Sequence, residues 1–284
     1  MVCWMREVAV ILPVHNEAWL IGSVLGQVTD FARNTPDWRF VFVDDGSSDN
    51  TPELISQHLQ RKGGGDSIEL VALSPNRGKA GAIREVMLSR EEAFLIFTDG
   101  DLAYSLDHLP QLCDALETHD VAIGSRALAD GPQTNITMAR RLVGSGFNRL
   151  VRLITGLPYH DTQAGLKGFR RDAAHTLFKE QVVEDFAFDA ELLYLAQKHG
   201  FTVAELPARV SARHSYKKSR VNMLRDPLKM LSSLVRMRLI HRGAHGNRDL
   251  RNEEKKTTDT PVSGLIEPKT SHITPRSRVR ARQR

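Results

Sequence analysis

The chain has 284 residues, which is enough for one sizeable α/β domain with an appendage, and its hydrophobic content of 41% is ordinary for a globular protein. Its two cysteines stand in unrelated contexts, which argues against a disulfide framework or a zinc site and fits a reducing cytosol. The net charge is +5, and no apolar run is long enough to predict a membrane-spanning helix.

Strand-like and helix-like patterns alternate along the first half of the chain. Such alternation predicts right-handed crossovers and an α/β fold, with a mostly parallel central sheet that carries helices on both faces. The expected strands are 8–12, 39–43, 68–73, 94–98 and 121–124, and the expected helices are 17–32, one capped by Ser48 or Asp49, 80–89 and 107–118.

The second half of the chain has a different character. A basic amphipathic helix is expected at 138–155, and YHDTQAGLKGF (159–169) has the pattern of a glycine-punctuated loop or an edge strand. The elements expected after it are a helix at 189–199, a strand at 201–210 and a last helix at 221–240, which Pro227 bends or restarts.

From about Arg242 onward the chain is rich in arginine and lysine, with serine, threonine and proline between them. This composition has too few large apolar residues to bury a core, so residues 242–284 are expected to form a basic disordered tail. Basic tails also bind nucleic acid or anionic membrane surfaces. A solvated tail is the simplest interpretation, and no specific nucleic-acid partner is expected.

The stretch FLIFTDGDLAYSL ends an apolar run in two aspartates, Asp99 and Asp101. At the end of a strand in a parallel sheet, two carboxylates can hold one hard cation such as Mg²⁺ or Mn²⁺, whose other ligands come from water and a substrate diphosphate. Gly100 between them allows a tight backbone and the close approach of a ligand. The alternative is a polar turn in which Asp101 caps the next helix.

Three further motifs lie near the ends of the expected strands. VFVDDGSSDNT places Asp44 and Asp45 where carboxylates accept hydrogen bonds from a base or a ribose, unless they only form a turn and a cap. In ILPVHNE, Pro13 ends the first strand, and Glu17 is either a ligand-facing acid or a first-turn acid of the next helix. NRGKAGA presents Lys79 after a glycine turn, which suits an anionic ligand, although the spacing is not that of a P-loop.

The ordered set PVHNE, DDGSSD, NRGKAGA and TDGD resembles glycosyltransferase family 2, a family of inverting enzymes with the GT-A fold. The resemblance covers roughly residues 8–229. Three later stretches, GSR (124–126), DTQAGLKGFRR (161–171) and AFDAELLYLAQKHG (187–200), are similar to those of the polyprenyl-phosphate sugar transferases, especially the dolichyl-phosphate glucosyltransferase branch. Ala103 stands where many mannosyl relatives have a glutamine metal ligand, which favours the glucosyl branch.

The resemblance implies a role for each candidate residue. The residues that it places along the nucleotide are Pro13, Glu17, Asp44, Asp45 and Lys79. It places the metal and the sugar diphosphate at Asp99, Gly100 and Asp101, and it gives Arg126 contacts with phosphate. The sugar and the acceptor would lie near Asp161, Gln163 and Asp189. An ionised lipid phosphate needs little general-base help, so Asp161 would then orient groups. A hydroxyl acceptor needs a base, for which Asp161 and Asp185 are the candidates. Ordinary turn or loop acids are the alternative for both.

The resemblance further implies Mg²⁺ or Mn²⁺, a UDP- or GDP-hexose donor and a polyprenyl phosphate acceptor, at the cytoplasmic face of the membrane with peripheral contact. It places a single GT-A domain at residues 1–241, with a nucleotide-binding half at about 7–126 and an acceptor half at about 127–241. Two alternatives remain: a family 2 enzyme that uses a hydroxyl acceptor, and a nucleotidyltransferase. Against the nucleotidyltransferase, the chain has PVHNE after its first strand, where such enzymes usually have a glycine-rich signature.

Overall fold

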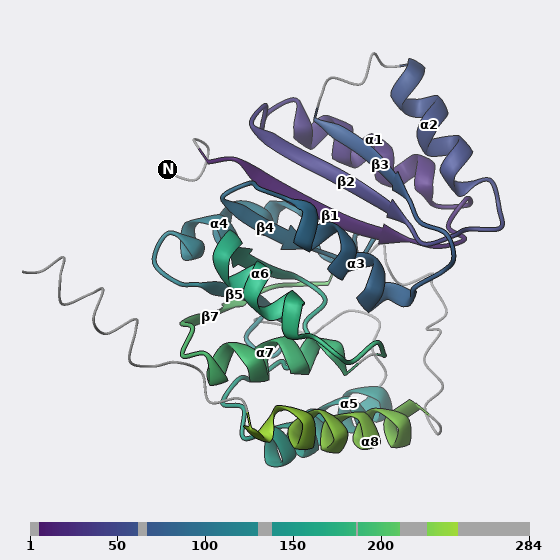
Figure 1. The fold of residues 1–284 in the computed structure, drawn as a ribbon. Coiled ribbons are helices and arrows are strands. Elements are labelled where there is room, and N and C mark those ends of the chain that lie inside the picture. Colours follow the sequence, from purple (N-terminus) through teal and green to yellow (C-terminus); the bar gives the residue numbers. More distant parts are fainter. Residues whose placement is uncertain (1–5, 62–66, 130–137, 186, 211–225, 244–284) are drawn as a thin grey trace, which may run out of the picture. The chain divides into compact units, whose positions relative to one another are not determined.

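In the computed structural model the sheet has seven strands in the order β3-β2-β1-β4-β6-β5-β7, with helices on both faces (Figure 1). The structure describes residues 6–61, 67–129, 138–185, 187–210 and 226–243. The strands are β1 (Val8–Val14), β2 (Trp38–Asp44), β3 (Ile68–Ala72), β4 (Phe94–Phe97), β5 (Val121–Ser125), β6 (Lys167–Arg170) and β7 (Val203–Pro207). The helices are α1 (Ile21–Ala32), α2 (Thr51–Arg61), α3 (Gly78–Ser89), η2 (Leu106–His108), α4 (Leu109–Leu116), α5 (Met138–Thr155), α6 (Arg171–Glu180), α7 (Phe188–Lys198), α8 (Asp226–Ile240) and η4 (His241–Gly243).

The sheet is mostly parallel, as the alternating pattern predicts. β1 pairs in parallel with β2 and β4, and β5 pairs in parallel with β7. The exception is β6, which runs antiparallel between β4 and β5. The expectation of a loop or edge strand at 159–169 is therefore wrong for its last residues, because β6 has a neighbour on each side and its backbone lies inside the sheet.

The two faces of the sheet bury separate cores. On β1, Ala9 and Ile11 join the cluster that includes α3, α6 and α7. Val8, Val10 and Leu12 point the other way and join the cluster with α1 and α4. A strand buried on both faces reads as a continuous apolar run, which is why this strand was correctly placed from the sequence.

Some element boundaries differ from the expectations. The first helix begins at Ile21 instead of residue 17, because the Glu17 carbonyl accepts hydrogen bonds from the N–H groups of Leu20 and Ile21, both at 2.9 Å, and forms a turn before the helix. Helix α6 was not predicted. In the last helix, Pro227 lies in the first turn of α8, where its missing N–H costs no helical hydrogen bond; residues 221–225 lie outside the described residues.

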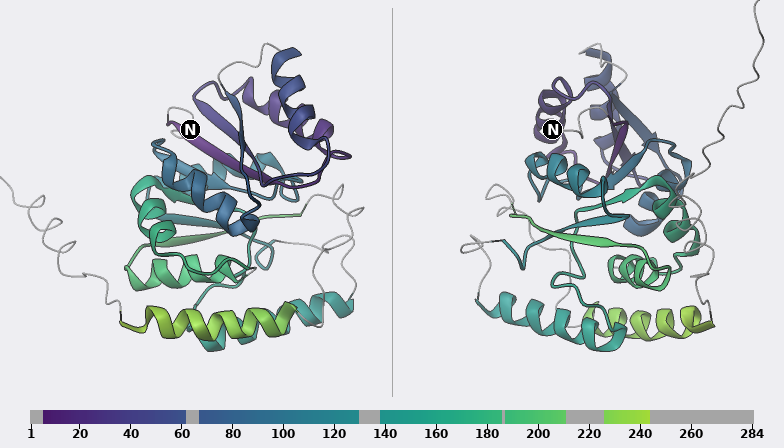
Figure 2. Two further views of the ribbon diagram at one scale, coloured as in Figure 1. Left: turned by 45° about the vertical axis from the view of Figure 1, so that its right-hand side comes forward. Right: turned by 90° about the vertical axis from the view of Figure 1, so that its left-hand side faces the viewer.

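Helices α5 and α8 lie side by side along α7, on the side away from the sheet (Figure 2). The inner face of α8 is buried through Met230, Leu234 and Met237, which belong to the core cluster. Beyond α8, His241 Nε2 lies 2.8 Å from Oε1 of the buried Glu191 of α7. One face of α8 is thus packed on the protein. No helix in the described part of the chain is both long and apolar enough to cross a bilayer.

Candidate active site

Strands β1, β2 and β4 bring their carboxyl ends to the same edge of the sheet. Val14 of β1 is in register with Asp44 of β2, and Ile11 of β1 is in register with Phe97, the last residue of β4. The N–H of Asp45 donates to the Val14 carbonyl at 3.0 Å. The polar clusters that follow these strands are therefore neighbours, and they are PVHNE, DDGSSD and TDGD.

Gly100 lies against the backbone of β1. A Cβ atom built at this position would lie 2.2 Å from the Pro13 carbonyl oxygen and 2.8 Å from Val14 Cγ1. A side chain therefore has no room there, and the glycine permits the close approach of two chain segments. Its expected approach to a ligand stays a prediction.

We expect Gly100→Ala to destabilise the fold, because the methyl group collides with backbone that cannot rotate away. The expected loss in the free energy of unfolding is about 1–3 kcal/mol, as for other overpacked sites. Urea denaturation measures it. Gly22→Ala is the matched control, since nothing lies within 4 Å of a Cβ built on that helical glycine. Equal stability of the two variants would contradict this account of Gly100.

Asp44 and Asp45 are both buried and both engaged in local contacts. Asp44 accepts hydrogen bonds from the hydroxyl and the N–H of Ser47, at 2.5 and 3.1 Å. Asp45 Oδ1 accepts one from the Arg77 N–H at 2.6 Å. Asp44 thus stabilises the turn after β2, and Asp45 connects that turn to the NRGKAGA segment. Recognition of a nucleoside by these two residues stays a prediction.

Glu17 lies next to the same turn. Its N–H donates to Thr51 Oγ1, the first residue of α2, at 2.9 Å, and its side chain is buried. A carboxylate in the turn before α1 lies near the positive end of that helix. Glu17 therefore lies beside the segment that leads from β2 into α2, and its contact with a nucleotide stays a prediction.

Lys79 lies in the first turn of α3, with its ammonium group 2.6 Å from Asp99 Oδ1. Burial alone would lower the pKa of Lys79, but the carboxylates of Asp99, Asp189 and Asp101 raise it above its ordinary value, so the group is a cation at neutral pH. The resemblance implied that this lysine contacts the nucleotide. In the structure its partner is the first aspartate of the expected metal pair.

Asp99 is also in close contact with the loop before β6. A Cβ atom at Gly165 would lie 2.4 Å from Asp99 Oδ2, so only a glycine leaves space for this carboxylate. Asp101 Oδ1 accepts a hydrogen bond from the Ala103 N–H at 3.2 Å. This contact is the one expected if Asp101 serves a polar turn, which was the alternative to a metal site. The importance of Gly165 was missed, because its neighbour Asp99 is distant in sequence.

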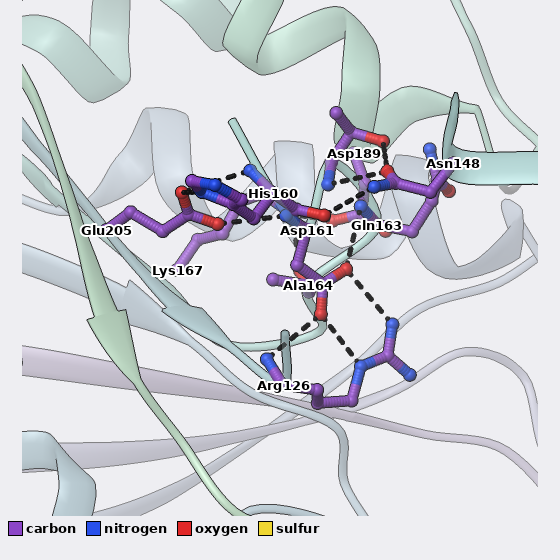
Figure 3. A network of polar contacts seen from close by, with 10 residues as sticks. Arg126, Asn148, His160, Asp161, Gln163, Ala164, Lys167, Asp189 and Glu205 are labelled. Carbon is purple, nitrogen blue, oxygen red and sulfur yellow. Dashed lines mark hydrogen bonds and ion pairs between the residues drawn. The ribbon is translucent and has the colours of Figure 1, made fainter. Parts of the chain in front are cut away.

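Arg126 and Asp161 form a two-pronged ion pair (Figure 3). The guanidinium Nε and Nη2 atoms donate to the two carboxylate oxygens at 2.8 and 3.1 Å, and the Arg126 N–H donates to Oδ2 at 3.1 Å. Burial would raise the pKa of Asp161, but the hydrogen bonds and charge of Arg126 hold it below its ordinary value. Asp161 is therefore ionised and oriented towards Arg126, which is a poor arrangement for removing a proton.

Two residues that the sequence did not single out hold the Asp161 loop in place. Glu205 of β7 accepts hydrogen bonds from the N–H groups of His160 and Asp161, at 3.0 and 2.9 Å. Asn148 of α5 accepts from the Thr162 hydroxyl at 2.6 Å. Figure 3 shows both side chains around the loop. A glutamate within a strand pattern was a weak signal for such a role, because exposed strand positions also carry glutamate.

Lys167 and Asp189 form a buried ion pair beside this loop. The Lys167 side chain is fully buried, and its ammonium group donates to Asp189 Oδ1 and to the Ala164 carbonyl (Figure 3). Burial lowers the pKa of Lys167, an effect that the charge of Asp189 opposes. Lys167 was missed, since a lysine in a short glycine-rich strand resembles a surface residue. Asp189 is thus fixed by a cation, next to the Lys79 and Asp99 pair.

The remaining predicted residues have different surroundings. Gln163 donates its N–H to Asp161 Oδ1 at 3.3 Å, and its buried side-chain nitrogen has no hydrogen-bond partner among the described residues. Asp185 accepts from the Ala187 N–H at 2.8 Å and from the Ser233 hydroxyl of α8 at 2.6 Å. These contacts tie α7 to α8, and neither partner belongs to the cluster around Asp99. A role for Asp185 as a base stays a prediction.

Tyr104 is an unpredicted member of the site. Its side chain is buried, and its hydroxyl lies close to the Gly165 backbone. Burial and the nearby carboxylates of Asp161 and Asp99 raise its pKa, although the charge of Arg126 opposes them. The phenol therefore keeps its proton at neutral pH and can donate a hydrogen bond beside the Arg126 guanidinium.

Comparison with known proteins gives a consistent result. The sequence profile described as "Glycosyl transferase family 2" matches residues 9–178. The chain is 31% identical over 251 residues to a dolichyl-phosphate β-glucosyltransferase of Saccharomyces cerevisiae, covering 82% of this chain and 74% of the relative. It is 29% identical over 266 residues to a dolichyl-phosphate β-glucosyltransferase of Trichomonas vaginalis, covering 89% of this chain and 75% of the relative.

A solved structure shares the fold. It is glucosyl-3-phosphoglycerate synthase from Mycobacterium tuberculosis, in complex with Mn²⁺, UDP-glucose and phosphoglyceric acid. The TM-score is 0.57 and the sequence identity is 17%, and the match covers 81% of this chain and 80% of that one. This likeness confirms the predicted α/β fold with a mostly parallel sheet.

Proposed function

Since the chain belongs to glycosyl transferase family 2, we propose that this glycosyltransferase moves a hexose from a nucleotide sugar to a polyprenyl phosphate, with inversion. The names of the curated relatives support a dolichyl-type phosphate acceptor and glucose as the sugar. The solved complex with UDP-glucose supports UDP as the nucleotide. UDP-glucose is therefore the first donor to test, ahead of a GDP-hexose.

One observation favours a phosphate acceptor over a hydroxyl. Asp161 is paired with the half-buried Arg126, and Asp189 is paired with the buried Lys167. Although burial would raise the pKa of Asp161, Arg126 holds it below its ordinary value, so this carboxylate is a weak base, and Asp189 is already bonded to the Lys167 ammonium. A lipid phosphate is already ionised at neutral pH and needs no proton removed, whereas a hydroxyl acceptor requires a base within hydrogen-bond reach.

The residues around Asp99 fit a divalent metal. Carboxylate oxygens are suitable ligands for Mg²⁺ or Mn²⁺, and Gly165 leaves room for the Asp99 carboxylate at this position. The Lys79 ammonium shows that this position attracts a cation. The described residues contain no group of three or more His, Cys, Asp or Glu side chains arranged around a metal. Asp99 and Asp101 would therefore hold the ion together with phosphate oxygens of the donor.

The chain's own residues would then carry out distinct tasks. When bound, the metal neutralises the leaving nucleoside diphosphate. Arg126, oriented by Asp161, and the Tyr104 hydroxyl would supply hydrogen-bond donors for phosphate oxygens. The Lys167 ammonium holds Asp189 next to this region. The Glu205 and Asn148 contacts keep the intervening loop in place, so that the groups need little rearrangement during the reaction.

The donor is tested with purified protein, short-chain polyprenyl phosphate, and either Mg²⁺ or Mn²⁺. We expect UDP-glucose to yield a glucosylated lipid, and chelation of the metal to stop its formation. GDP-mannose is the matched comparison. Efficient transfer from GDP-mannose alone would overturn the glucosyl assignment and leave the family assignment standing.

We also propose peripheral contact with the cytoplasmic membrane face through α5 and α8. Their outward side, here called the α5/α8 face, carries exposed apolar residues next to exposed arginines: Leu150, Leu153, Val235, Leu239, Ile240, Arg149, Arg236 and Arg242. The exposed fractions of Leu153 and Leu239 are 79% and 60%. Apolar side chains with flanking cations are typical of helices that lie on anionic membranes.

Vesicle binding tests this proposal. We expect sedimentation with phosphatidylserine vesicles that weakens with salt, because each cation near the surface contributes about 1 kcal/mol and screening reduces that attraction. The double substitution Leu153→Glu and Leu239→Glu should weaken binding by about tenfold or more, since each adds a negative charge and removes apolar contact. Leu54→Glu on α2, another exposed leucine, is the control. Unchanged binding of the double variant would contradict a role for this face.

A further inference from the structure

The Lys79 ammonium is held at one oxygen of the Asp99 carboxylate, where it takes the place of a bound cation. Nζ is 2.6 Å from Asp99 Oδ1, and the other oxygen, Oδ2, faces the backbone at Gly165. The charges of Asp189 and Asp101 also attract the ammonium, and it lies 5.7 Å from the centroid of the Phe188 ring. A metal ion that binds Asp99 would therefore meet a like charge at close range.

The local charges point in the same direction. Asp99, Asp101 and Asp189 carry three negative charges, and Lys79 and Lys167 carry two positive ones, so these described residues have a net charge of −1. A divalent ion alone would change this to +1. A divalent ion that arrives with a nucleoside diphosphate sugar, which carries two negative charges, leaves it at −1. The ion–donor complex thus enters without a change in local charge.

Lys79 is accessible to solvent, whereas Lys167 is not. The Lys79 side chain is 31% exposed, whereas that of Lys167 is 0% exposed. A lysine has a flexible four-carbon chain, so its ammonium can leave Asp99 without displacing the backbone. Lys79 lies in the first turn of α3, and the N–H groups at a helix N-terminus attract phosphate. A diphosphate at this point gives the ammonium a new partner.

We propose that Lys79 is the resident counter-ion of Asp99 and makes the metal and the donor bind together. Without a donor, the ammonium occupies the cation position and keeps metal affinity low. With a donor, the ammonium moves to a phosphate oxygen and the divalent ion takes its place at Asp99. This inference rests on the proposed function, because it needs a nucleotide-sugar donor and a metal at Asp99 and Asp101.

The test measures Mn²⁺ binding by calorimetry, with and without saturating UDP, and needs no acceptor and no turnover. Wild type is compared with Lys79→Met, which has a similar shape and no charge. Diphosphate oxygens ligate the metal in any case, so both proteins should bind Mn²⁺ more tightly with UDP. We expect Lys79→Met to bind Mn²⁺ alone at least about fivefold more tightly than wild type, and to gain correspondingly less from UDP.

Two controls make the result specific. Lys79→Arg keeps the charge and should behave like wild type, and Lys179→Met removes a charge from an exposed position of α6 and should leave Mn²⁺ affinity unchanged. If Lys79→Met does not fold, Lys79→Gln is the second neutral variant. Mn²⁺ affinity without UDP that does not rise in the neutral variant would overturn the inference. If wild type binds no UDP with Mn²⁺, the proposed function itself fails, which distinguishes the two results.

Discussion

Asp99→Asn is expected to lower the transfer rate by about 10²–10³-fold or more, the loss seen when a preorganised charge-stabilising group is removed. A neutral amide cannot hold a divalent ion beside a diphosphate as a carboxylate does. Its predicted partner residue, Asp101, should show a loss of similar size. The measurement is kcat with UDP-glucose at saturating Mg²⁺ or Mn²⁺.

The fold should survive this substitution. The Asp99 and Lys79 side chains are each about one third exposed, so solvent screens the lost ion pair and its effect on stability is small. Asp114→Asn, at an exposed position of α4, is the control and should keep full activity. Wild-type activity that survives complete chelation of divalent ions would contradict the metal role of Asp99.

Lys167→Met is expected to lower the free energy of unfolding by about 3–5 kcal/mol, because it leaves the buried Asp189 carboxylate without its hydrogen-bonded cation. Lys167 is fully buried in β6, and its ammonium group contacts Asp189 and the Ala164 carbonyl. Replacing both partners, as Lys167→Met with Asp189→Leu, should recover part of the loss, since two apolar groups need no charge partner.

Urea denaturation measures both variants. Lys179→Met is the control, because exposed substitutions change stability by about 0.5 kcal/mol or less. If Lys167→Met cost no more than this control, the buried pair would not be what stabilises the region around Asp189.

The parts of the fold predicted from the sequence are those determined by local pattern. Strands β1, β2 and β4 are nearly continuous apolar runs, because both of their faces are buried. Parallel pairing then places the residues that follow them at one edge, so the neighbourhood of Asp44, Asp45 and Asp99 followed from strand order. Helix α6 was missed because it begins directly after β6, with no loop signal between Arg170 and Arg171.

The contacts between side chains could not be predicted in this way. Lys79 lies 20 residues from Asp99, and Lys167 lies 22 residues from Asp189. Arg126 lies 35 residues from Asp161. Which cation meets which carboxylate depends on how the strands and loops pack, and local pattern carries no information about that packing. The sequence pointed to Lys79 and Arg126 as well as to the acids, but only the structure shows which cation meets which carboxylate.

The measurement that tests the proposed function most directly compares two acceptors that differ by one group. Purified protein with UDP-glucose and Mn²⁺ is given a short-chain polyprenyl phosphate or the polyprenol of the same length, and the glucosylated lipid is quantified. Since Asp161 and Asp189 are each held by a cation, the account predicts transfer to the phosphate and none above background to the alcohol. Efficient transfer to the alcohol, with little or none to the phosphate, would contradict it.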